Sequence, residues 1–165
     1  MRWATGPIRD STRCFISSAA LLVNVIAKMA NGDTRFNLLD GRQLDSADLR
    51  GRPLLVNFWS VTCSVCIRDM PALSRLQSSL ADRGLMVIGV ALDSDPPPVI
   101  IDLVEKQAPD YAIALDVHGE VSRAFGGISA TPTTFLIDAA GKIRYSAQGP
   151  LDEVRIRATL STFQG

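Results

Sequence analysis

The sequence has little of what marks a nucleic-acid binder or a repeat protein. Its Lys and Arg residues number 17 and its Asp and Glu residues also number 17, so it lacks the basic excess that attracts nucleic acid. It contains no internal repeat and no low-complexity tract beyond the prolines at 96–98. A length of 165 residues suits one domain that folds on its own hydrophobic core. We therefore expect an ordinary globular domain with no nucleic-acid partner.

Histidine and cysteine are also scarce, which limits the metal sites that the chain can build. A structural zinc site takes four ligands. Besides the pair Cys63 and Cys66, the chain offers only Cys14 and His118. We therefore expect no metal site and interpret His118 as a surface turn residue. The pair itself is then either a redox site or two thiols that only pack.

The sequence lacks a hydrophobic run long enough for a clear membrane span. Its apolar run at 14–27 is shorter than the ~18 residues that a span needs. Because three arginines precede this run, it fits a secretory signal peptide. In a helical projection the polar residues of the region instead share one stripe, as in an amphipathic helix on a membrane: Arg13, Ser17, Asn24 and Lys28. We expect residues 1–30 to be a signal peptide, a membrane anchor or an amphipathic helix, ahead of a domain at 33–165.

What the sequence does contain is a cysteine pair between a predicted strand and a predicted helix. The apolar run Leu54–Trp59 is typical of a buried strand, and Ile67–Leu80 carries apolar residues at helical spacing. Cys63 therefore falls at a helix N-terminus, where unpaired amides lower a thiol pKa from about 8.5 to roughly 3.5–7.5. We interpret Cys63 as the exposed nucleophile and Cys66, one turn on and facing inward, as the resolving thiol. This context favours redox chemistry over structural packing.

The rest of the chain predicts alternating strands and helices around this pair. A hairpin of Phe36–Leu39 and Arg42–Leu44 turns at Asp40–Gly41, because glycine tolerates the positive φ of a tight turn. Later strands are expected at 85–92, 111–115, 133–137 and 143–147, and later helices at about 97–107, 117–125 and from 152 onward. The stretch Asp93–Asp95 is expected to cap the first of these helices. This order predicts an α/β fold, a mixed sheet with helices on both faces.

Three segments, in the same order, resemble thioredoxin-like proteins of the TlpA, ResA and CcmG type. They are the lead-in Asp40–Leu44 with Asp48–Pro53, the segment Phe58–Pro71 with both cysteines, and the loop and strand Thr131–Asp138. The resemblance extends over the chain from about Phe36 to Phe163. It implies a thioredoxin-like fold with an N-terminal β-hairpin and with an inserted helix and strand between the two halves of the domain.

Two polar residues near the cysteines are candidates for proton transfer. Asp69 lies on the helical face of Cys66 and matches an acidic residue that the resembled proteins keep near the dithiol. We expect it to take part in catalysis by relaying the proton of Cys66, although the helix dipole alone also favours an acid in the first turn. Asn57 stands where thioredoxin has an acidic proton-transfer residue, and an amide cannot take a proton. The proton route then runs through Asp69 or through water.

The resemblance also implies a substrate-binding set around the cysteines. Pro132 matches the loop proline that is cis in thioredoxin-like folds and packs against the disulfide. The backbone of Thr131 is then expected to pair with an extended substrate peptide, in the manner of an added strand. Thr62 stands where the family usually has tryptophan, and the loss of that flat ring predicts a changed partner range. Trp59, at the end of the predicted strand, completes the expected set.

The function that the resemblance implies is that of a thiol-disulfide oxidoreductase that needs no cofactor, because its redox-active group is the Cys63–Cys66 disulfide. Such proteins usually work outside the cytoplasmic membrane, so we expect a periplasmic or extracytoplasmic protein with a membrane contact through residues 14–27. Its expected partners are exported protein thiols and disulfides, such as thiols awaiting haem or copper, and a membrane electron donor. The resemblance favours a reductant, while an oxidant or isomerase depends on the reduction potential. The alternative is a redox-inert binding module or chaperone that holds an apoprotein or a metal ion.

Overall fold

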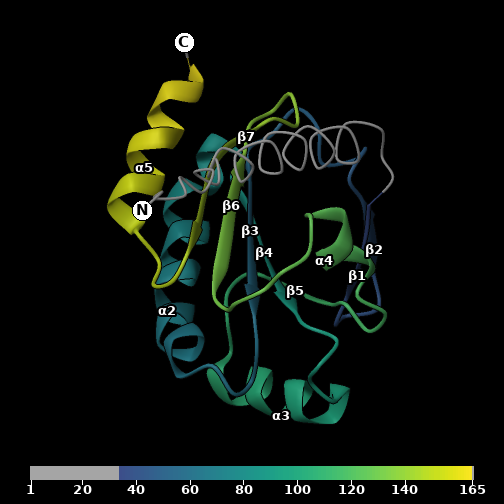
Figure 1. Cartoon of the computed structure of the whole chain (residues 1–165). Helices are drawn as coiled ribbons and strands as arrows, with labels where there is room; N and C mark the ends of the chain where they lie inside the picture. Colours follow the sequence, from purple (N-terminus) through teal and green to yellow (C-terminus); the bar gives the residue numbers. More distant parts are fainter. Residues whose placement is uncertain (1–33, 165) are drawn as a thin grey trace, which may run out of the picture.

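The computed structural model describes residues 34–164 and shows a sheet with helices on both of its faces (Figure 1). The predictions for residues 1–30, and Cys14 with them, lie outside the described residues. In the described part of the chain, no helix combines the length and the apolar character needed to cross a membrane. The elements are β1 (Arg35–Leu38), β2 (Gln43–Asp45), β3 (Leu54–Trp59), α2 (Ser64–Leu80), η2 (Ala81–Arg83), β4 (Met86–Ala91), α3 (Pro97–Gln107), β5 (Ala112–Leu115), α4 (Glu120–Ala124), β6 (Thr133–Ile137), β7 (Ile143–Gln148), α5 (Glu153–Ser161) and η3 (Thr162–Gln164).

The strands form one seven-stranded mixed sheet in the order β2-β1-β5-β4-β3-β6-β7. Strands β3, β4 and β5 are parallel, whereas the hairpin β1–β2 and the strands β6 and β7 pair in the antiparallel sense. Helix α3 and strand β5 stand between the two halves, as the expected insertion. The thioredoxin-like fold class is confirmed.

The hairpin turns at the predicted pair, and its strands are shifted by one residue. Gly41 has φ of 86°, a left-handed conformation that favours glycine. The Asp40 carboxylate accepts a hydrogen bond from the backbone N–H of Arg42 at 3.0 Å, which closes the turn. The hairpin then pairs with β5 and completes one side of the sheet.

Strand β3 is buried at all six positions and divides two hydrophobic cores. Val56 and Phe58 face the core that includes α4, where the ring of Phe58 lies 5.2 Å from that of Phe125. Leu55 and Trp59 face the opposite side, where α2 packs. Each large apolar side chain buried in this way contributes about 1.5–3 kcal/mol. The end of β3 is therefore well packed in the core, and it fixes where the turn before the cysteines begins.

Helix α2 confirms the predicted apolar spacing and the predicted place of Cys63 at the helix N-terminus, since Cys63 is the N-cap and the helix begins at Ser64. Its buried residues recur every three or four positions: Cys66, Met70, Leu73, Leu76 and Leu80. The first two of these join the core cluster of Trp59, and the last three pack with α5. One helix thus links the cysteine pair to the main core.

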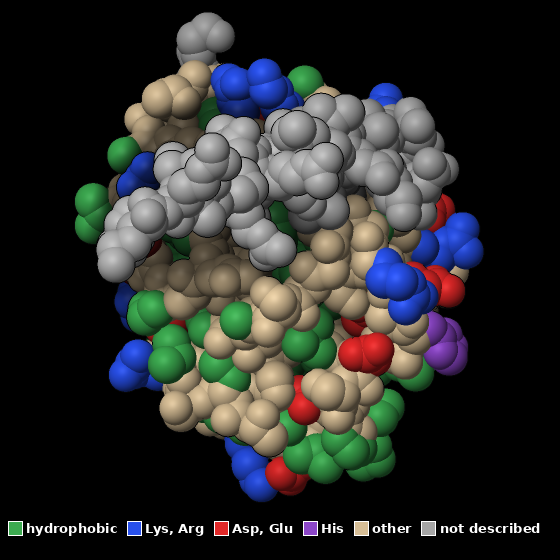
Figure 2. All heavy atoms as spheres, in the orientation of Figure 1, with side chains coloured by type: hydrophobic (Ala, Val, Ile, Leu, Met, Phe, Trp, Pro, Cys, Tyr) green, Lys and Arg blue, Asp and Glu red, His purple; other side chains and the backbone are tan. Residues whose placement is uncertain are grey.

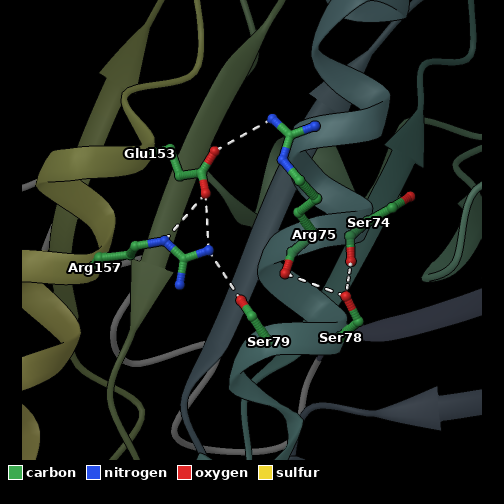
Figure 3. A network of polar contacts seen from close by, with 6 residues as sticks. All are labelled: Ser74, Arg75, Ser78, Ser79, Glu153 and Arg157. Carbon is green, nitrogen blue, oxygen red and sulfur yellow. Dashed lines mark hydrogen bonds and ion pairs between the residues drawn. The ribbon is translucent and has the colours of Figure 1, made fainter.

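Helix α5 is also held on α2 by a surface network (Figure 3). Glu153 accepts a hydrogen bond from Arg157 at 2.8 Å, and its second oxygen lies 3.5 Å from Nη2 of Arg75. Arg157 also donates to the Ser79 hydroxyl at 2.9 Å. The Arg157 hydrogen bond lowers the pKa of Glu153 from its ordinary value. Partly exposed pairs of this kind typically add about 0.2–1 kcal/mol each.

Candidate active site

The cysteine pair lies where β3 ends and α2 begins. Cys63 and Cys66 form a disulfide, and their Cα atoms are 5.2 Å apart. Cys63 is the N-cap of α2, and its Sγ accepts a hydrogen bond from the backbone N–H of Cys66 at 3.1 Å. The first amides of a helix lack intrahelical partners and carry partial positive charge, so they stabilise negative charge on this sulfur. Cys63 therefore stands where a thiolate is favoured.

The two sulfurs differ in their access to solvent. Cys63 is half-buried, whereas Cys66 is only 2% exposed and packs with Trp59 and Met70. A sulfur of another protein reaches Cys63 before it reaches Cys66. This asymmetry is the one that dithiol exchange uses, with an outer attacking sulfur and an inner resolving sulfur.

The turn before Cys63 is fixed by a chain of hydrogen bonds. The N–H of Cys63 donates to the carbonyl of Ser60 at 3.1 Å. The hydroxyl of Ser60 donates to Oδ1 of Asp95 at 3.0 Å, and the N–H of Val61 donates to Oδ2 of the same carboxylate at 2.8 Å. Asp95 is 7% exposed. A buried carboxylate from the connection between β4 and α3 thus holds the turn that presents the nucleophile.

This arrangement corrects the predicted role of Asp93–Asp95 as helix caps. The N-cap of α3 is Pro96, and no side chain caps the helix. Asp95 turns toward the active site because β3 and β4 are parallel neighbours, with Trp59 paired to Ala91 at their ends. The carboxyl ends of neighbouring parallel strands meet at one edge of a sheet, so the residues that follow them lie close together. That rule, applied to an acid just beyond β4, was the signal by which the sequence could have revealed Asp95.

The loop before β6 lies beside the end of β3. Phe58 pairs with Thr133, and the preceding Thr131–Pro132 peptide bond is cis. Pro132 is buried and Thr131 is half-buried. The carbonyl of Pro132 accepts a hydrogen bond from the N–H of Gly149 at 2.9 Å, so the connection after β7 supports the loop. The structure therefore brings Thr131 and Pro132 to the end of the sheet that carries the cysteines.

Asp69 lies on α2, three residues beyond Cys66, and is half-buried. Its Oδ2 accepts a hydrogen bond from the backbone N–H of Leu151 at 2.8 Å. Leu151 belongs to the same connection between β7 and α5 that supports Pro132. The carboxylate thus ties α2 to the connection that holds the proline loop. A role for Asp69 in proton transfer remains a prediction.

Two buried residues of β3, Asn57 and Trp59, lie in the core next to the site. Asn57 is buried, and its amide donates a hydrogen bond to the Thr134 hydroxyl at 3.0 Å. Trp59 is 1% exposed and packs in the cluster of Cys66. A partner therefore has no access to the Trp59 side chain in this arrangement, because the ring supports the dithiol from within the core. Thr62, in contrast, is exposed beside Cys63.

His118 is exposed in the turn before α4. Within residues 34–164, no three His, Cys, Asp or Glu side chains lie together where they could hold a metal ion. The group with redox chemistry in this part of the chain is the Cys63–Cys66 disulfide.

The chain is similar to proteins that are named for thiol-disulfide exchange. It is 30% identical over 112 residues to the thiol-disulfide oxidoreductase ResA of Bacillus thuringiensis subsp. konkukian, a match that covers 67% of this chain and 63% of that protein. It is 34% identical over 120 residues to the thiol:disulfide interchange protein DsbE of Pseudomonas fluorescens biotype C, covering 73% of this chain and 65% of that protein. The chain therefore spans less than two thirds of the length of these relatives.

A solved structure and a family model agree with these relatives. The crystal structure of a thiol:disulfide interchange protein of the thioredoxin family from Chlorobium tepidum matches with a TM-score of 0.70 at 28% identity, covering 80% of this chain and 93% of that one. The model of the Redoxin family matches residues 27–161, which include both cysteines, the turn before them and the proline loop. The chain belongs to the Redoxin family.

Proposed function

We propose that this chain is a thiol-disulfide oxidoreductase that works through Cys63 and Cys66. The observation that carries the proposal is the asymmetry of the pair. The half-buried Cys63 caps α2 and accepts an amide hydrogen bond, while Cys66 is 2% exposed behind it. Two thiols that only packed would both lie in the core and would need no helix amide at one sulfur.

The proposed reaction is a pair of thiol-disulfide exchanges. The Cys63 thiolate attacks one sulfur of a partner disulfide, forms a mixed disulfide and expels the other partner sulfur as a thiolate. Cys66 then loses its proton, and its thiolate attacks Sγ of Cys63. This step releases the second partner thiol and leaves the Cys63–Cys66 disulfide. The partner gains two electrons and two protons, and the dithiol loses the same.

A partner is proposed to dock at the end of the sheet that carries the dithiol. Helix α3 lies at this end (Figure 1), and its apolar side chains Val99 and Ile101 are 47% and 39% exposed. Figure 2 shows hydrophobic side chains gathered over this helix. An extended partner segment is proposed to lie along the backbone of Thr131, with Thr62 beside the attacking sulfur. Apolar partner residues then suit the exposed face of α3.

The proposed direction is reduction of disulfides in exported proteins to thiols, outside the cytoplasm and with electrons from a membrane donor. The names of the ResA and DsbE relatives support thiol exchange, and the apolar pattern of residues 14–27 supports export or anchoring. A measured reduction potential tests the direction, because the reduction potential of thioredoxin is about −270 mV and that of the oxidant DsbA about −120 mV. Mass spectrometry of protein from its native host tests the location. Cytoplasmic protein that retains residues 1–30 would contradict export.

The test of the activity is the reduction of insulin in the presence of dithiothreitol, followed by turbidity. The protein should accelerate the reaction, and both Cys63→Ser and Cys66→Ser should lose the acceleration. When the reduced Cys66→Ser variant is freed of dithiothreitol and then mixed with insulin, it should accumulate a mixed disulfide with the insulin chain, visible by mass spectrometry, because no resolving thiol remains. Cys63→Ser is the matched control, since it retains the buried thiol and lacks the attacking one.

The same experiment separates the enzyme from a redox-inert binding module or an apoprotein chaperone. A binding module would leave the insulin reaction at its uncatalysed rate and would form no adduct in Cys66→Ser. Its affinity for the partner would also be unchanged by the Cys63→Ser substitution. This pair of results would falsify the proposed oxidoreductase.

A further inference from the structure

Two aspartates of the described residues are buried, and they serve different parts of the fold. Asp116 is 3% exposed and accepts hydrogen bonds from the N–H groups of Val121 and Ser122, at 2.9 and 2.8 Å, so it fixes the start of α4. Asp95 is 7% exposed and caps no helix. Its carboxylate is directed instead at the turn before Cys63.

The bonds of Asp95 organise the whole turn. Ser60 has a single hydroxyl proton, and it is directed to Asp95. The Thr62 hydroxyl, 3.0 Å from the Ser60 hydroxyl, is therefore the donor of that pair, and the N–H of Thr62 also points to the same oxygen at 3.3 Å. The polar groups between β3 and Cys63 thus converge, directly or through Ser60, on one carboxylate.

We propose that Asp95 is a positioning residue for Cys63, one that fixes the turn before the nucleophile and places a negative charge at that turn. This inference rests on the proposed thiol exchange. The hydrogen bonds hold Ser60, whose carbonyl accepts from the N–H of Cys63 at 3.1 Å, so the carboxylate acts on the placement of the sulfur through one intervening residue. Its charge opposes the helix amides, because a nearby negative charge disfavours a thiolate.

Other charged groups near the turn are placed differently. Arg68 is exposed on α2, and Asp93 is exposed in the connection that carries Asp95. Asp69 is directed at the N–H of Leu151. The proline loop at 129–133 contributes no charged residue. Among these charged side chains, Asp95 is therefore the one that accepts hydrogen bonds from the residues of the turn.

The test compares Asp95→Asn and Asp95→Ala with Asp116→Asn as a matched buried control. In the reduced proteins, the rate of Cys63 alkylation is measured against pH. Asp95→Asn retains an acceptor for Val61 and removes the charge, so it should lower the pKa of the Cys63 thiol by about half a unit to one unit, about three- to tenfold in the thiol–thiolate ratio. Asp116→Asn should leave this pKa unchanged.

Asp95→Ala tests positioning separately from charge. It removes both acceptor bonds, so the turn loosens and the fully ionised Cys63 should attack an insulin disulfide at least about threefold more slowly than in Asp95→Asn. A pKa of Cys63 in Asp95→Asn equal to that in Asp116→Asn would overturn the inference, as would equal attack rates for the two Asp95 variants. The alkylation arm needs no partner protein. If the pKa moves and the wild-type protein does not reduce insulin, the proposed function fails while the role of Asp95 in setting Cys63 stands.

Discussion

The two ends of helix α2 have different roles, and each end is held by a different kind of contact. At its start, Cys63 and the turn before it are held by hydrogen bonds to a helix amide and to Asp95. Toward its end, Leu73 and Leu76 are 1% and 0% exposed in the core shared with α5. Hydrogen bonds at the first end set the reactivity of a sulfur, whereas apolar burial at the second end stabilises the fold. Substitutions at the two ends should therefore separate activity from stability.

The largest expected effect is the loss of activity in Cys63→Ser. A serine hydroxyl is not ionised near neutral pH, so disulfide exchange should fall on the order of a thousandfold or more. The serine oxygen can still accept the N–H of Cys66, as the sulfur does at 3.1 Å. The melting temperature of this variant should therefore match that of the reduced wild-type protein. A large drop in melting temperature would show that the two ends of α2 are not separable.

The converse substitution is Leu76→Ala, at the other end of the helix. Leu76 is fully buried, and truncating a buried leucine typically costs about 2–5 kcal/mol. Urea unfolding should show this loss in the free energy of unfolding. Insulin reduction per folded molecule should stay near the wild-type rate, since the substitution does not touch the turn or the proline loop. A specific activity that fell with stability would contradict the separation.

The same contrast explains which features could be predicted from the sequence. Apolar spacing located β3 and α2, and the position of Cys63 at the start of the helix followed from local order along the chain. The role of Asp95 did not follow, because its partner Ser60 is 35 positions away and local reasoning made it a helix cap. The bond between Asp69 and Leu151 spans 82 positions and leaves no trace in residue spacing. Contacts set by burial periodicity are predictable, whereas polar contacts between loops depend on the finished sheet.

A moderate effect is expected for Asp69→Asn, which sharpens the assignment at the start of α2. Removing a negative charge near Cys66 should lower the pKa of its thiol, and Cys63 should change less. If Asp69 also relays the proton, resolution of the mixed disulfide should slow by about tenfold while the first attack by Cys63 is nearly unchanged. Thiol titration and single-turnover exchange measure the two effects.

The contact with Leu151 provides the competing explanation. Asparagine still offers an oxygen to the Leu151 N–H, which Asp69 binds at 2.8 Å, whereas Asp69→Ala offers none. If Asp69 is only a tether, Asp69→Asn should behave as wild type in both measurements, and only Asp69→Ala should lose stability. Resolution would then depend on water near Asn57.

The smallest expected effect is at the surface network between α2 and α5, with Glu153→Gln. Hydrogen bonding by Arg157 lowers the pKa of Glu153 in the folded protein. A lowered folded pKa means that the stabilisation is fully present above the unfolded pKa, near 4.3, and is lost as pH falls through the folded value. The Glu153 side chain is 29% exposed and that of Arg157 38%, so screening limits the effect to about 0.5 kcal/mol.

Urea unfolding should show Glu153→Gln less stable than wild type at pH 7 and equal to it near pH 3. Glu105→Gln, on the exposed side of α3, is the matched control and should show no such difference. A Glu153→Gln loss that persisted unchanged at pH 3 would mean that packing of this side chain, and not its charge, holds α5 on α2.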